Sequence, residues 1–290
     1  MVNKRKSGKS WGSRGNRPRN RHSQDHNHNH RDHHEGDFNR QRSHIPHVQR
    51  PSYPNEDSGL TLDRIVELFE SKKTKTVLDL TSGVGHTGLA IAPKAEHVFI
   101  CDEKSNRFRE ARDLIQSRGL KNVTTLVAEF DNLPFKNGTF DAVVARATAN
   151  RFQDVRLCMK EIARVTGKGG RVIIVDNLVP TDTEVDRFLN QIESTQNPAH
   201  VRYYNAKEWK VLLADAGLKV KALEEDVVED EGGGTLNQWL NREGLNPVVA
   251  KRITGMLISA NRKIKDAVNF RVDLGEIYVQ PRKVLVVGGK

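Results

Sequence analysis

The chain has 290 residues, of which 47 are Lys or Arg and 37 are Asp or Glu, and its formal net charge is +10 at pH 7. No apolar run approaches the roughly 20 residues that a membrane-spanning helix needs, so we expect no membrane span. Two cysteines, Cys101 and Cys158, are typical of the reducing cytoplasm and do not suffice for an iron–sulfur cluster. We therefore predict a cytoplasmic protein, long enough for one large core or two small ones.

Residues 1–50 differ in composition from the rest of the chain. They hold 12 of the Lys and Arg residues, 4 of the Asp and Glu residues and eight of the 11 His residues. With so few apolar residues they cannot offset the entropy cost of ordering, so we predict a disordered, basic, His-rich tail over residues 1–55. Such a tail can attract nucleic acid or another acidic surface, or it can act only as a solubilising arm. Its His run lacks the spacing of a tetrahedral metal site, and we predict no bound metal.

The folded part is expected to open with a helix over residues 61–70, where apolar residues recur at helical spacing. The stretch from Val77 to Gly88 (VLDLTSGVGHTG) follows: an apolar strand with one carboxylate, a glycine-rich turn, and a helix predicted to begin near His86. Glycine lacks a Cβ, so a ligand can approach the main chain closely, and a helix N-terminus presents unpaired N–H groups to it. The pattern indicates a βα unit that binds an adenosine-bearing cofactor.

Two classes of cofactor use a turn of this kind. Read as Gly83-x-Gly85-x-x-Gly88, it matches the dinucleotide fingerprint, and Asp102 lies 19 residues after Gly83, near the spacing of a ribose-binding acid. Read as Asp79-x-x-x-Gly83-x-Gly85, it resembles the first motif of class I S-adenosylmethionine (SAM) methyltransferases. Asp79 favours the second interpretation, because a buried carboxylate is costly unless paired and the methionine end of SAM is cationic. A tight turn without a ligand is the remaining alternative.

Further strands alternate with helices along the chain. Strands are predicted at residues 97–102, 122–135, 138–146 and 167–176, with a helix over residues 152–166 before the last of them. This alternation indicates an α/β fold with a parallel sheet and right-handed crossovers. Ligands bind such sheets at the carboxyl ends of the strands, where Asp102, Glu129 and Arg146 fall.

Three segments carry a resemblance to a known family: LDLTSGVGHTGLA (78–90), AEFDNLPFKNGTFDAVVAR (128–146) and MKEIARVTGKGGRVIIVD (159–176). In order and spacing, the chain from about residue 58 to residue 290 resembles class I SAM-dependent methyltransferases of the ubiquinone/menaquinone-biosynthesis (methyltransferase type 11) group. The resemblance implies a Rossmann-like sheet of seven mostly parallel strands with helices on both faces. It also implies S-adenosyl-L-methionine as the cofactor.

The resemblance further implies which residues hold that cofactor. Those expected to line the methionine moiety are Asp79, Thr81, Ser82, Gly83 and Gly85. Asp102 would accept hydrogen bonds from both ribose hydroxyls. Glu129 would accept one from the adenine amino group, and the Phe130 N–H would meet a ring nitrogen. Asn150 and Arg151 stand where close relatives often have a pair of histidines.

Two segments after the fifth strand are interpreted as insertions into the basic α/β fold. Residues 178–205 are predicted to form a lid over the substrate pocket, and His200 within them is a candidate to orient the methyl acceptor or take its proton. Arg146 is the second catalytic candidate. Residues 232–269 are predicted to be a helical insertion that serves packing, and residues 276–287 a final antiparallel strand.

We predict that the chain transfers the methyl group of SAM to an unidentified acceptor, with a small molecule favoured. No (Asn/Asp)-Pro-Pro-(Tyr/Phe) loop follows the fourth strand, which argues against methylation of the amino groups of bases. Two alternatives stay open at this point. One is a nicotinamide-dependent oxidoreductase, which rests on the glycine spacing alone; the other is a catalytically silent SAM-fold protein that binds RNA through its basic tail.

Overall fold

A computed structural model of the chain describes residues 59–70, 74–81, 83–229, 234–241 and 245–290. The predicted tail over residues 1–55 lies outside these residues, as does Ser82. The described residues all belong to a unit that extends from Pro51 to Lys290.

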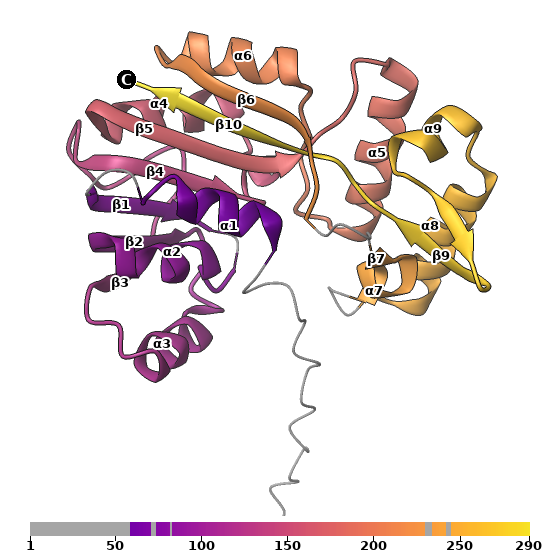
Figure 1. Ribbon diagram of the computed structural model, residues 1–290, viewed down its shortest axis with the longest axis horizontal. Helices are drawn as coiled ribbons and strands as arrows, with labels where there is room; N and C mark the ends of the chain where they lie inside the picture. The colour runs from indigo at the N-terminus through magenta and orange to yellow at the C-terminus, as the bar shows by residue number, and fades with distance from the viewer. Residues whose placement is uncertain (1–58, 71–73, 82, 230–233, 242–244) are drawn as a thin grey trace, which may run out of the picture. The chain divides into compact units, whose positions relative to one another are not determined.

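A seven-stranded sheet forms the centre of this unit, in the order β3-β2-β1-β4-β5-β10-β6 (Figure 1). Its strands are β1 (Thr74–Leu80), β2 (Ala95–Asp102), β3 (Val123–Val127), β4 (Phe140–Arg146), β5 (Thr166–Asn177), β6 (Lys219–Val227) and β10 (Lys283–Gly289). The first five run parallel, and β10 is antiparallel to both of its neighbours. The predicted Rossmann-like α/β fold is therefore confirmed.

Helices cover both faces of the sheet because its central strands are apolar on both sides. One face packs against α4 (Val155–Val165) and α6 (Ala206–Asp215), and the other against α1 (Leu60–Glu67), α2 (His86–Ile91) and α3 (Phe108–Ser117). Along β1, Leu78 and Leu80 belong to the first core and Val77 to the second. Since side chains alternate along a strand, Asp79 lies on the same face as Val77, beneath α2.

A smaller layer stands beside the sheet and is built from α5 (Thr183–Gln196), α7 (Leu236–Asn241), α8 (Pro247–Ser259) and α9 (Arg262–Ala267) (Figure 1). A three-stranded antiparallel sheet completes it, in the order β7 (Gly234–Thr235), β9 (Glu276–Val279), β8 (Arg271–Asp273). Its own apolar core includes Ile192, Ile253, Leu257 and Val279. The predicted lid and the predicted insertion thus pack against each other.

Three details differ from the sequence expectations. The single strand predicted over residues 276–287 is two strands, because Pro281 has no N–H to donate and Gln280 donates to Val268 O at 2.7 Å. The long apolar stretch after residue 247 is two helices, because the side chain of Asn261 caps a new one at α9. Strand β6 was not predicted.

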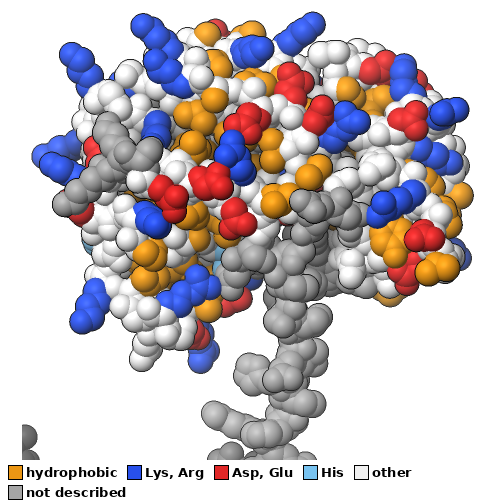
Figure 2. All heavy atoms as spheres, viewed as in Figure 1, with side chains coloured by type: hydrophobic (Ala, Val, Ile, Leu, Met, Phe, Trp, Pro, Cys, Tyr) orange, Lys and Arg blue, Asp and Glu red, His pale blue; other side chains and the backbone are white. Residues whose placement is uncertain are grey.

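Two 3₁₀ turns complete the described chain, η1 (Ala92–Lys94) and η2 (Ala149–Arg151), and η2 extends from the end of β4 toward the lid. On the face drawn in Figure 2, basic and acidic side chains are interspersed over the described surface. None of the helices in the described ranges is long and apolar enough to cross a membrane.

Candidate active site at the carboxyl ends of the strands

The turn between β1 and α2 is held against β2. The N–H of Thr81 donates to Cys101 O at 2.8 Å. Gly85 caps the start of α2 with φ of +85°, and a Cβ at that position would lie 2.5 Å from Cγ2 of Ile100. Only glycine satisfies both demands, so Gly85 lets the turn pack directly against Ile100 of β2. Gly83 also lies in this turn, where a Cβ would be 3.3 Å from Nη1 of Arg107.

Asp79 is almost fully enclosed beneath the turn, with 1% of its surface exposed. Its Oδ2 accepts a hydrogen bond from the Gly88 N–H at 2.8 Å, and a Cβ at Gly88 would lie 2.9 Å from that oxygen. Burial raises the pKa of Asp79 to about 7, opposed by the Gly88 N–H and by the charge of Arg146. A carboxylate at this depth is suited to a cationic partner.

A second acid lies at the end of β2. Asp102 is 8% exposed, its Oδ1 accepts from the Lys104 N–H at 2.9 Å, and burial raises its pKa. Beyond β3, Glu129 is exposed, whereas the Phe130 ring is buried. These positions agree with the expected places of a ribose acid and of the residues beside an adenine.

Glu103 is a residue of this region that the sequence interpretation missed. Its Oε1 lies 3.5 Å from the Phe130 N–H, at the far limit of a hydrogen bond, and burial raises its pKa. The Phe130 N–H, which was expected to meet an adenine ring nitrogen, therefore faces the Glu103 carboxylate in this structure. The sequence signal for Glu103 was its position directly after Asp102.

Arg146, at the end of β4, binds two groups from distant parts of the chain. Its Nε donates to Thr61 Oγ1 at 3.1 Å, and its Nη2 donates to Glu229 Oε1 at 2.5 Å. Lys283 Nζ lies 3.6 Å from the other oxygen of Glu229. Burial alone would raise the pKa of Glu229, but Lys283 and Arg146 outweigh it and lower that pKa. Arg146 therefore ties α1 and the segment after β6 to the strand end beside Asp79.

The turn η2 connects the sheet to the lid. The Asn150 N–H donates to Asp176 Oδ2 at 2.9 Å, while the Asn150 carbonyl accepts from the N–H groups of Val201 and Arg202 at 2.7 and 3.2 Å. Asp176, the penultimate residue of β5, is buried, and burial raises its pKa to about 6. Asp176 follows the same rule as Asp102, an acid at a strand end, so that rule could have identified it.

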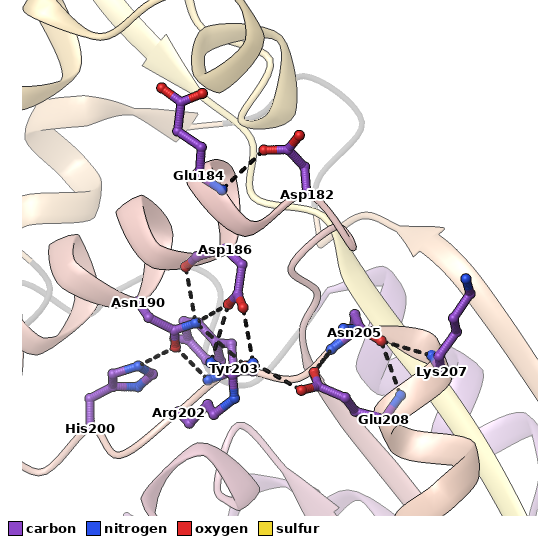
Figure 3. Close-up of polar contacts among 10 residues, drawn as sticks. All are labelled: Asp182, Glu184, Asp186, Asn190, His200, Arg202, Tyr203, Asn205, Lys207 and Glu208. Carbon is purple, nitrogen blue, oxygen red and sulfur yellow. Dashed lines mark hydrogen bonds and ion pairs between the residues drawn. The ribbon is translucent and has the colours of Figure 1, made fainter.

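His200 lies within the segment 178–205, where it is buried and contacts α5 and its own loop (Figure 3). Its Nε2 is 2.9 Å from Asn190 Oδ1, which also accepts the Tyr203 N–H at 2.6 Å. Because Asn190 Oδ1 is an acceptor, His200 carries its proton on Nε2. The imidazole packs against the Tyr203 ring, with 4.5 Å between centroids. Burial lowers the pKa of His200 to about 4, so the ring is neutral near pH 7.

Ion pairs fix the same loop from the outside. Arg202 donates to Asp186 and to Glu208 at 2.9 Å each, and Glu208 completes a capping box with Asn205 at the start of α6. Asn190 and Asp186, both on α5, carried no recognisable sequence signal, since polar residues are ordinary on a helix at the surface.

Together these elements define one site. Asp79 and Arg146 lie near each other at the carboxyl ends of the paired strands β1 and β4, and Asp102 lies at the carboxyl end of β2. His200 follows in the segment 178–205, beyond η2. Two buried acids, Asp79 and Asp102, thus lie at the ends of neighbouring strands beside the glycine-rich turn.

Comparisons with known proteins agree with this geometry. A family model described as a methyltransferase domain matches residues 71–232. The chain is 28% identical over 211 residues to the uncharacterized methyltransferase YcgJ of Bacillus subtilis (strain 168), covering 73% of this chain and 80% of the relative. It is 33% identical over 132 residues to a demethylmenaquinone methyltransferase of Thermotoga maritima, covering 45% of this chain and 55% of that protein.

Solved structures show the same fold. The crystal structure of YcgJ superposes with a TM-score of 0.71 at 26% identity, covering 79% of this chain and 97% of that one. A geranyl diphosphate methyltransferase in complex with SAM superposes with a TM-score of 0.57 at 16% identity, covering 79% and 84% of the two chains, and shows the fold alone. Because the family model matches more than half of its residues, the chain belongs to the methyltransferase domain family and is a SAM-dependent methyltransferase.

Proposed function

We propose that the chain methylates a small molecule bound between the carboxyl ends of β4 and β5 and the lid. The observation that supports this proposal is the contact between that edge and the segment 178–205. The Asn150 carbonyl accepts the N–H groups of Val201 and Arg202, and Asn177 Nδ2 donates to the Tyr203 hydroxyl at 2.8 Å. Strand ends covered in this way are typical of a site for a small acceptor.

SAM supplies an activated methyl group on a sulfonium, so the protein must chiefly orient donor and acceptor and exclude water. Under this proposal Asp79 pairs with the methionine ammonium and Asp102 holds the ribose. Thr81, Gly83 and Gly85 present backbone to the cofactor, and Ser82, outside the described residues, keeps its predicted place in that turn. Glu129 and the Phe130 N–H face the adenine once Glu103 moves aside.

His200 then orients the acceptor and does not carry its proton. A pKa of about 4 makes it a weak base at neutral pH, while the bond from Nε2 to Asn190 leaves Nδ1 as a hydrogen-bond acceptor. Arg146 acts as a positioning residue, because its guanidinium is bonded to Thr61 and Glu229. It holds α1 against the strand end next to Asp79.

Transfer of a radioactive methyl group from SAM into fractionated cell extract tests the proposal. We expect label in the small-molecule fraction with the wild-type chain and loss of that label with Asp102→Ala. Label confined to the RNA or protein fraction would contradict the small-molecule acceptor. The family assignment gives the nicotinamide alternative no support. RNA binding through residues 1–55 is a separate question that this assay does not address.

A further inference from the structure

Three buried polar atoms of the site have no hydrogen-bond partner among the described residues: Asn150 Oδ1, Arg151 Nε and His200 Nδ1. They lie on two elements that are bonded to each other, since the Asn150 carbonyl accepts the N–H groups of Val201 and Arg202. Buried polar groups are normally paired, so three in one place indicate a ligand with complementary groups. Two of these atoms are acceptors and one is a donor.

Two half-buried arginines among the described residues, Arg151 and Arg171, have no carboxylate within ion-pair distance, whereas Arg146, Arg164 and Arg202 each have one. Arg171 instead donates to Thr74 and lies over the Phe69 ring. The Nε of Arg151 is enclosed without an acceptor, which is costly for an N–H group. This arginine lies at the carboxyl edge of the sheet.

The surroundings of Arg151 locate its charge within the site. Burial lowers the pKa of His200, and the Arg151 charge adds to that effect. Burial raises the pKa of both Asp102 and Asp176, and the same charge opposes each rise. These groups belong to the end of β2, the end of β5 and the lid, so the guanidinium lies where the three meet.

We propose that Arg151 binds an oxyanion of the methyl acceptor, while His200 Nδ1 and Asn150 Oδ1 accept hydrogen bonds from a hydroxyl or amino group beside that oxyanion. This inference rests on the proposed function and names its substrate class: small acids that carry a neighbouring O–H or N–H. A guanidinium is suited to oxyanions because it is permanently charged and presents several N–H donors in one plane. The oxyanion would form the direct ion pair that Arg151 does not form with Asp102 or Asp176.

The carboxylate of SAM itself is a rival source of the same chemistry. It is distinguished by comparing S-adenosylhomocysteine, which has that carboxylate, with 5′-methylthioadenosine, which lacks it. Three probes test the acceptor site. Glycolate has a carboxylate beside a hydroxyl. Acetate lacks the hydroxyl, and glycolamide lacks the negative charge.

The experiment follows the Arg151 Nε–H signal by nitrogen NMR in the ¹⁵N-labelled full-length chain saturated with S-adenosylhomocysteine, after calorimetry has shown that this ligand binds. The signal is assigned by its loss in Arg151→Lys. We expect glycolate to shift it, acetate to bind more weakly, and glycolamide to leave it in place. Arg151→Gln should weaken glycolate roughly tenfold or more, whereas Arg187→Gln, on the exposed side of α5, should match the wild type.

Two results would overturn the inference. One is a signal that does not respond to glycolate while S-adenosylhomocysteine is bound. The other is a signal that shifts when S-adenosylhomocysteine binds, does not shift with 5′-methylthioadenosine, and shows no further shift when glycolate is added. That result would mean that Arg151 binds the carboxylate of the cofactor. If Arg151→Gln does not fold, the wild-type titrations still decide the matter. Failure of S-adenosylhomocysteine to bind at all would instead refute the proposed function.

Discussion

The carboxylate of Asp79 accepts a hydrogen bond from the backbone N–H of Gly88 at 2.8 Å. The acid at the end of β1 and the third glycine of the motif are thus partners, and the glycine is required because a Cβ would lie 2.9 Å from the acceptor oxygen. This pairing keeps the acid buried while leaving its second oxygen available. Two predictions follow from the contact.

The affinity for SAM should depend on pH through Asp79. Burial raises the pKa of Asp79 to about 7, so below that pH the free protein holds the acid largely protonated, and a cationic ligand must displace the proton. Affinity should therefore rise by up to about tenfold per pH unit as pH increases toward 7, and then level off. Calorimetry in buffers of different ionisation enthalpy should detect the released proton below pH 7. Asp79→Asn should bind more weakly and release none; identical proton release in this variant would refute the assignment.

Gly88→Ala and Gly255→Ala should have opposite effects although both glycines are helical. At Gly88 the added Cβ meets Asp79 Oδ2 and, at 2.8 Å, Cγ1 of Ile100, whereas at Gly255 in α8 it meets nothing within 4 Å. We expect Gly88→Ala to lower the free energy of unfolding by roughly 1–3 kcal/mol and to lower the affinity for SAM. Gly255→Ala should raise it by about 1 kcal/mol and leave SAM affinity unchanged. Urea denaturation with ligand titration measures both; equal behaviour of the pair would contradict the contact.

Asp102→Ala should lower the affinity for S-adenosylhomocysteine about ten- to a hundredfold, because a charge-assisted hydrogen bond to the ribose contributes roughly 1.5–3 kcal/mol. Asp113→Ala is the matched control, since Asp113 is exposed on the nearby α3. Calorimetry of the two variants with the same ligand gives the comparison. If Asp102→Ala binds as tightly as the control, the ribose acid lies elsewhere.

The parts of this site that are local in sequence could be predicted. The placement of Asp79, Gly85 and Asp102 at neighbouring strand ends could be predicted because a strand, its terminal acid and the following turn are contiguous, and parallel strands bring such ends to one edge; their roles toward SAM stay predictions. The role of Gly88 could not be read in the same way. Its spacing fitted a dinucleotide motif equally well, and only its distance to Asp79 shows what it does.

The parts that depend on distant segments could not be predicted. Glu229 lies 83 residues beyond its partner Arg146, and no pattern in the chain links the two. The partnership of His200 with Asn190 likewise depends on how α5 lies against its own loop. The break between β9 and β10 within residues 276–287 has a local cause in Pro281. That β9 joins the three-stranded sheet and β10 the seven-stranded sheet depends on distant strands.

His200 should make the protein less stable in mild acid. Burial lowers its pKa to about 4, whereas in the unfolded chain the imidazole keeps its ordinary pKa of 6.5. Between these values the unfolded state holds more protons on His200 than the folded state, so the contribution of His200 to the free energy of unfolding falls as pH falls, by on the order of 3 kcal/mol across the window. His200→Gln keeps an N–H for Asn190 but cannot titrate, so its free energy of unfolding should rise relative to that of the wild type from pH 6.5 to pH 4.

The comparison must be made as a difference between the two proteins. Asp79 acts in the opposite sense over the whole of this window, because an acid whose pKa is raised on folding lowers stability as pH rises through its range. That contribution is common to wild type and variant and cancels when their unfolding free energies are subtracted. Denaturant titrations at several pH values between about 4 and 7 provide the curves. Parallel curves would show that His200 is not held neutral in the folded protein, and its assignment as an uncharged hydrogen-bond acceptor for the substrate would then be withdrawn.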